Sequence, residues 1–153
     1  MRAWSVEQPG PMASGPLVLG ERPDPQPGPG EVLVRVHACG VCRTDLHLAE
    51  GDLVPHRPGT VPGHEVVGSV IGHGPGAGRI PTGTRVGVPW LRSTCGTCRF
   101  CARGRENLCT DPRFTGWDAD GGYAELIIAP EAFVYALPYP FVDVTGASLT
   151  CAG

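Results

Sequence analysis

Four cysteines close together form the first group of residues able to do chemistry in this 153-residue chain. They are spaced as Cys-x2-Cys-x2-Cys-x7-Cys, at Cys95, Cys98, Cys101 and Cys109. Four thiolates arranged tetrahedrally, about 2.3 Å from one ion, form a closed structural zinc site. An iron–sulfur cluster is the main alternative, but bacterial ferredoxins use a shorter last gap and a following proline. Free cysteines or a disulfide pair remain further alternatives, and the spacing favours zinc.

A second group of metal-binding residues is spread along the chain. Cys42 opens the segment Cys-Arg-Thr-Asp-Leu-His, and His64 follows within Gly-His-Glu. A catalytic zinc needs three protein ligands and one open position, and Cys151 near the chain end supplies a third candidate. Taken singly, each of these residues also fits a buried cysteine or a hydrogen-bonded core histidine. The residues alone therefore leave an open Cys–His–Cys site as one of two interpretations.

Three polar residues directly after Cys42 could serve such a site. Thr44 and His47 lie three residues apart, so on a helix they share one face and can form a proton path. Asp45 could hold a ligand histidine in orientation. The alternatives are a hydroxyl at the helix start, a capping acid and a surface histidine. Their occurrence together beside Cys42 favours the functional interpretation.

Hydrophobic periodicity and turn residues predict the elements that position these groups. The 23 glycines and 17 prolines indicate a turn-rich β domain rather than a helical bundle. A short helix closed by Gly51 is expected at residues 43–50, and residues 142–153 could begin another. Strands are expected at the first residues and at 17–20, 31–39, 65–71, 85–90, 123–128 and 133–137. Many short strands favour a barrel or sandwich over a doubly wound parallel sheet.

Composition excludes several classes of function. The basic residues are twelve arginines without a lysine, which excludes phosphate loops of the Walker type, because those loops require a lysine. The net charge of −3 argues against nucleic acid and acidic membranes as partners. The alternating glycines at 72–78 fit no dinucleotide fingerprint and are expected to form a turn. The chain has no secretion signal and no apolar stretch long enough to span a bilayer, so a cytoplasmic protein is expected. In that reducing compartment, closely spaced cysteines more often bind metal than form disulfides.

Three motifs in this order resemble the medium-chain zinc-dependent alcohol dehydrogenases. They are Gly-Val-Cys-Arg-Thr-Asp-Leu-His at 40–47, Gly-His-Glu at 63–65 and the four-cysteine loop, and the similarity covers essentially the whole chain. The resemblance implies a mainly β fold, a GroES-like, partly open β-barrel. Residues 1–137 would form this catalytic domain, and residues 138–153 would be a truncated connection toward a nucleotide-binding Rossmann domain that is absent from the sequence.

The resemblance also implies a role for each site residue. Cys42, His64 and Cys151 would bind the catalytic zinc, with Glu65 as an occasional extra ligand, and Cys95, Cys98, Cys101 and Cys109 would bind the structural zinc. Thr44 would hydrogen-bond the alcohol oxygen, and His47 would pass its proton to solvent through the cofactor ribose. Arg43 matches a position that contacts the cofactor pyrophosphate.

Trp90 and Leu53 resemble walls of the substrate pocket, although core packing is an equal alternative for both. Cys39 is expected to pack within its strand rather than to bind metal.

The implied function is reversible, zinc-dependent oxidation of a small primary or secondary alcohol to an aldehyde or ketone, with hydride transfer to NAD(P). The expected cofactors are two zinc ions per chain and NAD(P), and the full-length enzyme is expected to be a homodimer or homotetramer. Without the nucleotide-binding half, this chain alone is expected to bind the structural zinc but to show no turnover. The alternatives are a zinc-finger-like binding module and a non-catalytic GroES-like remnant that only binds partners.

Overall fold

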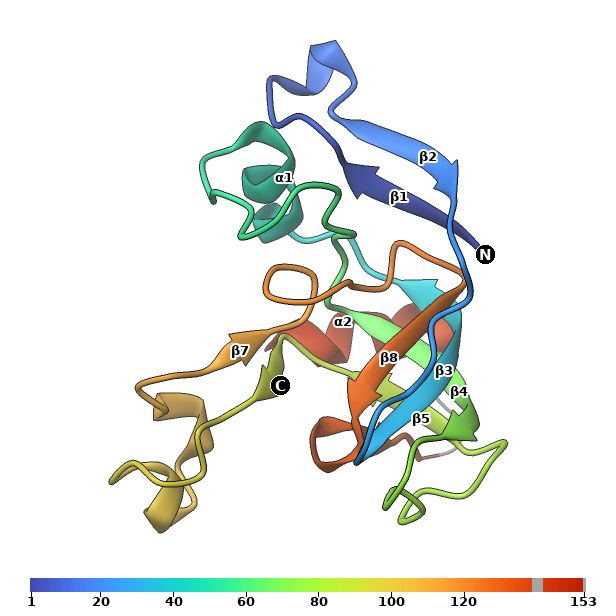
Figure 1. Ribbon diagram of the computed structural model, residues 1–153, viewed down its shortest axis with the longest axis vertical. Coiled ribbons are helices and arrows are strands. Elements are labelled where there is room, and N and C mark those ends of the chain that lie inside the picture. The colour runs from blue at the N-terminus through green and yellow to red at the C-terminus, as the bar shows by residue number, and fades with distance from the viewer. Residues whose placement is uncertain (139–141, 153) are drawn as a thin grey trace.

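A five-stranded antiparallel sheet forms the centre of the molecule (Figure 1). The computed structural model describes residues 1–138 and 142–152, the last two by their backbone alone. Within the sheet the strand order is β8-β3-β4-β5-β9. The strands are β3 (Glu31–Cys39), β4 (Val66–His73), β5 (Arg85–Val88), β8 (Leu126–Pro130) and β9 (Tyr135–Ala136). This arrangement confirms the predicted mainly β fold.

The core lies on one face of this sheet and is built mainly from β-branched residues. Along β3 the fully buried Val32 and Val34 alternate with less buried neighbours, as expected for a strand with one face on a core. The pairing of β3 with β4 shifts register twice, between Leu33 and Val34 and between Val36 and Ala38. Such bulges increase local twist and bend a strand, which curls the sheet around its core. The core contains Val32, Val34, Val66, Val70, Ile80, Val86, Val88, Ile127, Ala129 and Val134.

The remaining elements surround the sheet. β1 (Arg2–Val6) pairs with β2 (Leu17–Glu21), and the short helix η1 (Met12–Ser14) connects them. β6 (Leu91–Ser93) pairs with β7 (Arg113–Phe114) and carries a lobe that projects away from the sheet (Figure 1). This lobe contains the short helices η2 (Cys101–Arg103) and η3 (Glu106–Leu108), while η4 (Glu131–Phe133) connects β8 to β9. The helix α1 (Arg43–Glu50) ends at Gly51, whose φ of 92° suits a glycine cap, as predicted.

Three predicted strands differ from the observed ones. The strand expected at 85–90 is split into β5 and β6 around Pro89, which has no N–H to donate to a ladder. The strand expected at 123–128 begins at Leu126, because Tyr123 pairs instead with Trp4 of β1 and with Pro62 in the loop before β4. The strand expected at 133–137 is reduced to β9, because η4 occupies the residues before it.

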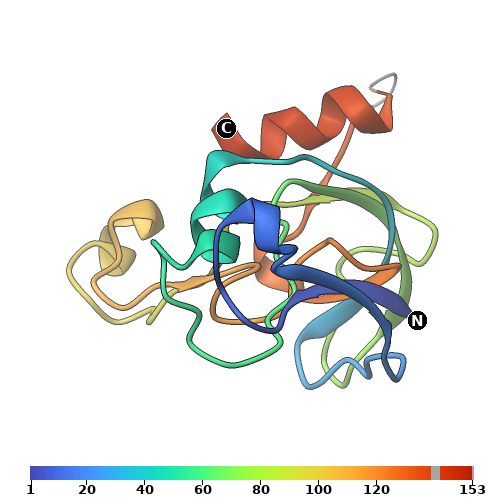
Figure 2. The same ribbon diagram turned by 90° about the horizontal axis from the view of Figure 1, so that it is seen from above.

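The helix α2 (Asp143–Ala152) lies against β3, β4 and β5 (Figure 2). At its first residue, Asp143 accepts a hydrogen bond of 2.6 Å from Arg85 Nε. Gly87 allows close approach further along, because a Cβ there would lie 2.9 Å from the Cγ2 of Thr150. The domain boundary predicted near residue 137 stays a prediction. Among the helices of the described residues, none has the length and hydropathy needed to cross a membrane.

Candidate metal centres

The four cysteines of the lobe converge on one point. Their sulfur atoms all lie within 4.8 Å of one another, with separations of 3.5 Å for Cys98–Cys101, 3.6 Å for Cys109–Cys95 and 4.0 Å for Cys95–Cys101. A tetrahedral zinc ion with bonds of about 2.3 Å would separate its sulfurs by about 3.8 Å. The four thiols therefore have the spacing that a zinc ion requires.

Backbone N–H groups surround the same sulfurs. Cys109 Sγ accepts from the amides of Cys95 and Asp111, each at 3.4 Å, and Cys95 Sγ accepts from the amide of Cys98 at 3.3 Å. Donors of this kind favour the thiolate over the thiol. The backbone amides of Cys101 and Thr110 lower the pKa of Cys98 to about 5. The loop thus favours the ionised form at Cys98, whereas burial raises the pKa of Cys101 to about 11.

A second group brings together Cys42, His64 and Glu65. One ligand atom from each lies within 4.8 Å of the others, and the side chains of His64 and Glu65 are buried, with 2% and 8% of the residue surface exposed. Cys42 directly precedes α1, whereas His64 and Glu65 lead into β4. The predicted third ligand, the side chain of Cys151, lies outside what the structure describes.

The β3–β4 pairing explains why these distant residues meet. The last residue pair of the ladder is Cys39 with Val66, and the amide of Gly40 donates to the carbonyl of Glu65 at 2.9 Å. The segment after β3 and the segment before β4 therefore lie side by side at this edge of the sheet. The first contains Cys42 and the second contains His64. A side chain at Gly40 would displace the Glu65 side chain, because a Cβ there would overlap the Glu65 carboxylate.

Asp45 connects the two chain segments of this group. Its Oδ2 accepts from the amide of Cys42 at 2.9 Å, and its Oδ1 accepts from the amide of Gly63 at 2.9 Å. Oδ1 also lies 3.3 Å from Nδ1 of His64, which has no well-formed hydrogen bond among the described residues. Because Nδ1 faces this carboxylate, Nε2 is the ring nitrogen left for a metal. Asp45 is thus placed beside the His64 ring, and its role in orienting a histidine ligand stays a prediction.

The charges of Asp45 and His64 stabilise each other. Burial alone raises the pKa of the Asp45 carboxyl, but the close approach of the His64 ring and the hydrogen bond from the Cys42 amide outweigh burial, and the net pKa is lowered. For His64, burial lowers the pKa, but Asp45 and Cys42 outweigh it and the net pKa is raised. Nearby Cys39 differs, because burial raises its pKa to about 12 and its side chain packs against the apolar core. The packing role predicted for Cys39 is confirmed.

A glycine-rich segment that the sequence reasoning missed holds the His64 loop in place. The amides of Gly121, Gly122 and Tyr123 donate to the carbonyls of Val61, Gly63 and Pro62, at 2.7, 2.7 and 3.0 Å. A side chain at Gly121 would overlap the carbonyl oxygen of Gly63. The signal available in the sequence was the pair Gly-Gly followed by tyrosine, which marks a close backbone approach.

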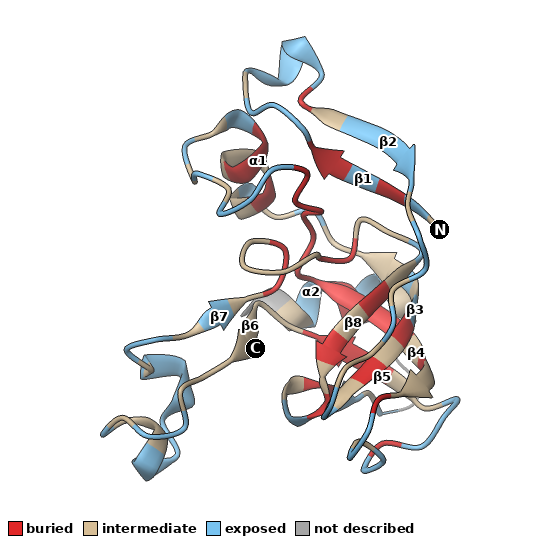
Figure 3. Cartoon of the chain, viewed as in Figure 1, coloured by how far each residue is buried: buried red, intermediate tan, exposed pale blue. Residues whose placement is uncertain are grey.

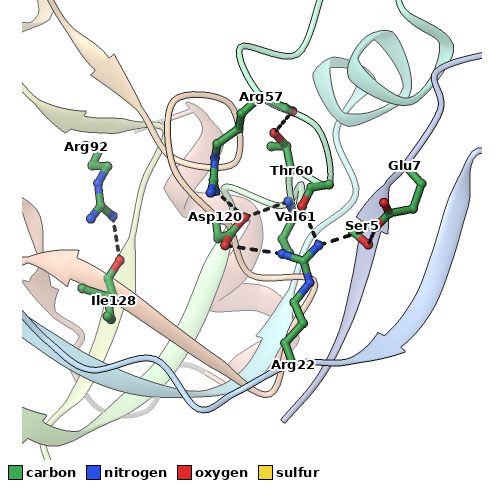
Figure 4. A network of polar contacts seen from close by, with 10 residues as sticks. Ser5, Glu7, Arg22, Arg57, Thr60, Val61, Arg92, Asp120 and Ile128 are labelled. Atoms are coloured by element: carbon green, nitrogen blue, oxygen red, sulfur yellow. Dashed lines mark hydrogen bonds and ion pairs between the residues drawn. The ribbon is translucent and has the colours of Figure 1, made fainter.

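Asp120 extends this support into a network of charged side chains (Figure 4). Its carboxylate accepts from the amide of Val61 at 3.0 Å and forms ion pairs with Arg57 and Arg22. A hollow of about 360 Å³ beside the network is lined by Arg57, Arg92 and Glu31 among others, but by no residue of either metal group. Arg92 pairs with Glu31 at 2.8 Å, so this hollow's charges are already matched. We therefore assign this network a structural role and not a catalytic one.

The predicted proton-path residues both lie on α1. Thr44 Oγ1 is 3.7 Å from Cys42 Sγ, so the hydroxyl borders the metal group. The His47 side chain is 40% exposed, and its Nδ1 lies 3.0 Å from Asp52 Oδ2. Arg43, the first residue of the helix, is exposed. The helix therefore carries one group beside the candidate site and two groups that reach solvent.

Trp90, predicted as a pocket wall, lies directly beside His64. The two ring centroids are 4.7 Å apart and the rings meet edge to face. Sequence reasoning did not anticipate that Phe114 and Trp117 stack with Trp90, at centroid distances of 4.6 and 6.3 Å. The other predicted wall, Leu53, is half-buried in the loop after α1, next to Val54, whose carbonyl accepts from the indole N–H of Trp117.

Comparison with known proteins identifies the class of protein that this fold and these two metal groups define. The family model of the alcohol dehydrogenase GroES-like domain matches residues 28–139. The chain therefore belongs to the medium-chain zinc-dependent alcohol dehydrogenase family, as its N-terminal GroES-like domain. This confirms the resemblance and the GroES-like fold inferred from the sequence.

Among individual relatives, the chain is 56% identical over its whole length to the probable alcohol dehydrogenase AdhA of Mycobacterium tuberculosis, of which it covers 46%. It is 47% identical to an alcohol dehydrogenase of Rhizobium meliloti over 90% of this chain and 41% of the relative. A cobalt- and zinc-bound thermostable alcohol dehydrogenase from Pyrobaculum aerophilum superposes with a TM-score of 0.87 at 34% identity, over 98% of this chain and 44% of that one. The chain thus spans less than half the length of these relatives.

Proposed function

We propose that this chain is the zinc- and substrate-binding half of an NAD(P)-dependent alcohol dehydrogenase, which oxidises a primary or secondary alcohol reversibly to an aldehyde or ketone. The observation that carries the proposal is the convergence of Cys42, His64 and Glu65 around a carboxylate-oriented imidazole. Membership in the alcohol dehydrogenase family supports the reaction class. NAD(P) would be bound mainly outside this chain, with Arg43 contributing to the pyrophosphate.

In the proposed site, Cys42, His64 and Cys151 would hold a zinc ion, and Glu65 would serve as an occasional additional ligand. When bound, the zinc supplies positive charge that polarises the hydroxyl of a small alcohol. The donor set fits this ion, because a sulfur and an imidazole are preferred zinc ligands and because the carboxylate of Asp45 raises the basicity of the histidine.

Thr44 and His47 would remove the hydroxyl proton. Thr44 Oγ1, which borders Cys42, would hydrogen-bond the alcohol oxygen and accept its proton while passing its own onward. His47 would release the proton to solvent, and its half-exposed ring and its pairing with Asp52 support that role. The four cysteines of the lobe would bind the second, structural zinc. A dimeric or tetrameric assembly of the full-length enzyme stays a prediction.

Metal analysis of the purified chain tests the two sites. We expect two zinc ions per chain, and one in the Cys42→Ser variant. Cys39→Ala is the matched control, because this cysteine lies three residues away but packs against the core, and it should retain two. A single zinc ion in the unaltered chain would favour a non-catalytic remnant. Equal loss of zinc in the Cys42→Ser and Cys39→Ala variants would show that Cys42 is not a specific ligand.

Joining the chain in frame to the part of the Mycobacterium tuberculosis relative that it does not cover tests the reaction. The chimera should reduce NAD or NADP in the presence of an alcohol, and the Cys42→Ser version should lose this activity while retaining its fold by circular dichroism. The unjoined chain should show no turnover. An active Cys42→Ser chimera would contradict the proposal.

A further inference from the structure

Tyr123 contacts both of the chain segments that carry the proposed zinc ligands. Its hydroxyl donates to the carbonyl of Gly40 at 3.4 Å, in the segment that leads from β3 to Cys42. Its amide donates to the carbonyl of Pro62 at 3.0 Å, in the segment that leads through His64 into β4. One residue therefore spans the gap between the segment after β3 and the segment before β4.

The ring of Tyr123 rests on the His64 segment at Gly63. Gly63 has a φ of 96°, a left-handed conformation that favours glycine, and a Cβ there would lie 2.6 Å from the ring atom Cδ1 of Tyr123. The backbone of Tyr123 is held from the other side, because its carbonyl accepts from the amide of Trp4 in β1 at 2.8 Å. The ring is therefore fixed between two neighbouring segments, with its hydroxyl at the Gly40 carbonyl.

The surroundings of the Tyr123 hydroxyl make it a hydrogen-bond donor. Burial raises the pKa of this hydroxyl far above its usual range, and the nearby Asp45 carboxylate raises the pKa further. The phenol therefore keeps its proton, and a buried hydroxyl needs an acceptor for that proton. The Gly40 carbonyl is such an acceptor in this structure. A phenylalanine at position 123 would fill the same space but would leave the two segments without this connection.

We propose that Tyr123 is a positioning residue of the proposed zinc site, and that its hydroxyl fixes the Cys42 segment relative to the His64 segment. This inference rests on the proposed function. Asp45 already joins the same two segments through the amides of Cys42 and Gly63, so Tyr123 provides a second connection across the same gap. Ligands held at a fixed separation lose less conformational freedom when an ion binds. The hydroxyl should therefore raise the zinc affinity of this site without binding the ion itself.

The Tyr123→Phe variant tests the proposal, because it removes the hydroxyl and retains the ring. In the zinc-free chain, the amides of Cys42 and Gly63, which both donate to Asp45, should exchange with solvent faster than in the unaltered chain. The expected increase is about 2- to 10-fold, the effect of losing one ordinary hydrogen bond, while the amides of β4 should exchange as before. Tyr135→Phe is the matched control, because Tyr135 is 55% exposed in β9 and its hydroxyl should not affect these amides.

Competition with a chelator for the zinc-loaded chain gives the second readout. In Tyr123→Phe the ion of the Cys42–His64 group should bind about 2- to 10-fold more weakly, and the ion of the four-cysteine lobe should bind as before. Unchanged amide exchange or unchanged zinc affinity would overturn the positioning role. Equally faster exchange throughout β4 would also overturn it, because it would indicate a general loss of stability. The exchange measurement needs no metal, so a chain that binds a single zinc ion contradicts the proposed function without deciding this test.

Discussion

The two metal groups of this molecule are built in opposite ways. The four-cysteine lobe takes all its ligands from one short segment, residues 95–109, and its helices η2 and η3 contain no buried residue. The Cys42–His64 group takes ligands from distant segments and lies on a sheet with a continuous apolar core. Figure 3 shows the contrast as a lobe without buried residues beside a largely buried centre.

This difference indicates what holds each site together. In the lobe, little apolar surface is removed from water, so the free energy that orders the chain must come from the metal. The Cys42–His64 group, which we call the barrel site, lies in the GroES-like sheet domain. There, backbone hydrogen bonds from residues 121–123 and the Asp45 carboxylate hold the ligands in position without a metal. We therefore expect the lobe to depend on zinc for its fold and the barrel site to persist without it.

Zinc removal gives the largest expected effect. Structural zinc contributes about 10–16 kcal/mol in zinc-finger peptides, far more than the lobe's few hydrogen bonds can replace. Treatment with a strong chelator should abolish amide hydrogen-exchange protection in residues 95–113 and leave β3 and β4 protected. The Cys98→Ser variant should behave in the same way without a chelator.

The contrast would fail if both regions lost protection together. That outcome would mean that the barrel also needs metal to fold. If the lobe kept its hydrogen-exchange protection after complete zinc removal, its fold would not depend on zinc. Another source of stability would then be required.

An intermediate effect is expected from a change in the scaffold of the barrel site. Gly121→Ala places a methyl group against the carbonyl oxygen of Gly63, which backbone hydrogen bonds prevent from moving away. Such overpacking should cost about 3 kcal/mol of unfolding free energy. The control is Gly20→Ala, where nothing lies within 4 Å, and its change should stay within about 0.5 kcal/mol. Urea denaturation of both variants measures the difference, and equal stabilities would remove residues 121–123 as the support of the site.

The sequence predicted the local features of this molecule well. The cysteine spacing indicates the lobe site because all four ligands lie in one loop, and alternation along residues 31–39 predicts β3 with its observed bounds. The helix at residues 43–50 follows from its helix formers and the glycine after them.

Features that depend on register could not be obtained in this way. Two bulges shift the pairing of β3 with β4, so which residues face each other at the strand ends cannot be counted from the sequence. The grouping of Cys42 with His64 came from resemblance to a family rather than from periodicity. The stacking of Phe114 and Trp117 with Trp90 was missed, because β6 and β7 have only three and two residues and no detectable periodicity.

The smallest expected effect is a change in zinc affinity at the barrel site alone. Asp45→Asn keeps the shape of the side chain but removes the negative charge that faces His64, together with one of the two oxygens that accept from the amides of Cys42 and Gly63. Loss of such a partner typically reduces metal affinity about 10- to 100-fold. Competition with a chromophoric chelator should show this loss for one of the two zinc ions, while the ion of the four-cysteine lobe is released as before.

Asp52→Asn is the matched control for this variant, because Asp52 also pairs with a histidine of the same region but is 68% exposed. Its effect on both zinc affinities should be small, since exposed ion pairs contribute about 0–1 kcal/mol. If Asp45→Asn weakened both zinc ions equally, the two regions would be coupled, and the distinction between a metal-folded lobe and a preformed barrel site would not hold. If only the barrel ion is weakened, the carboxylate acts on its own site, and the lobe holds its metal independently of the rest of the molecule.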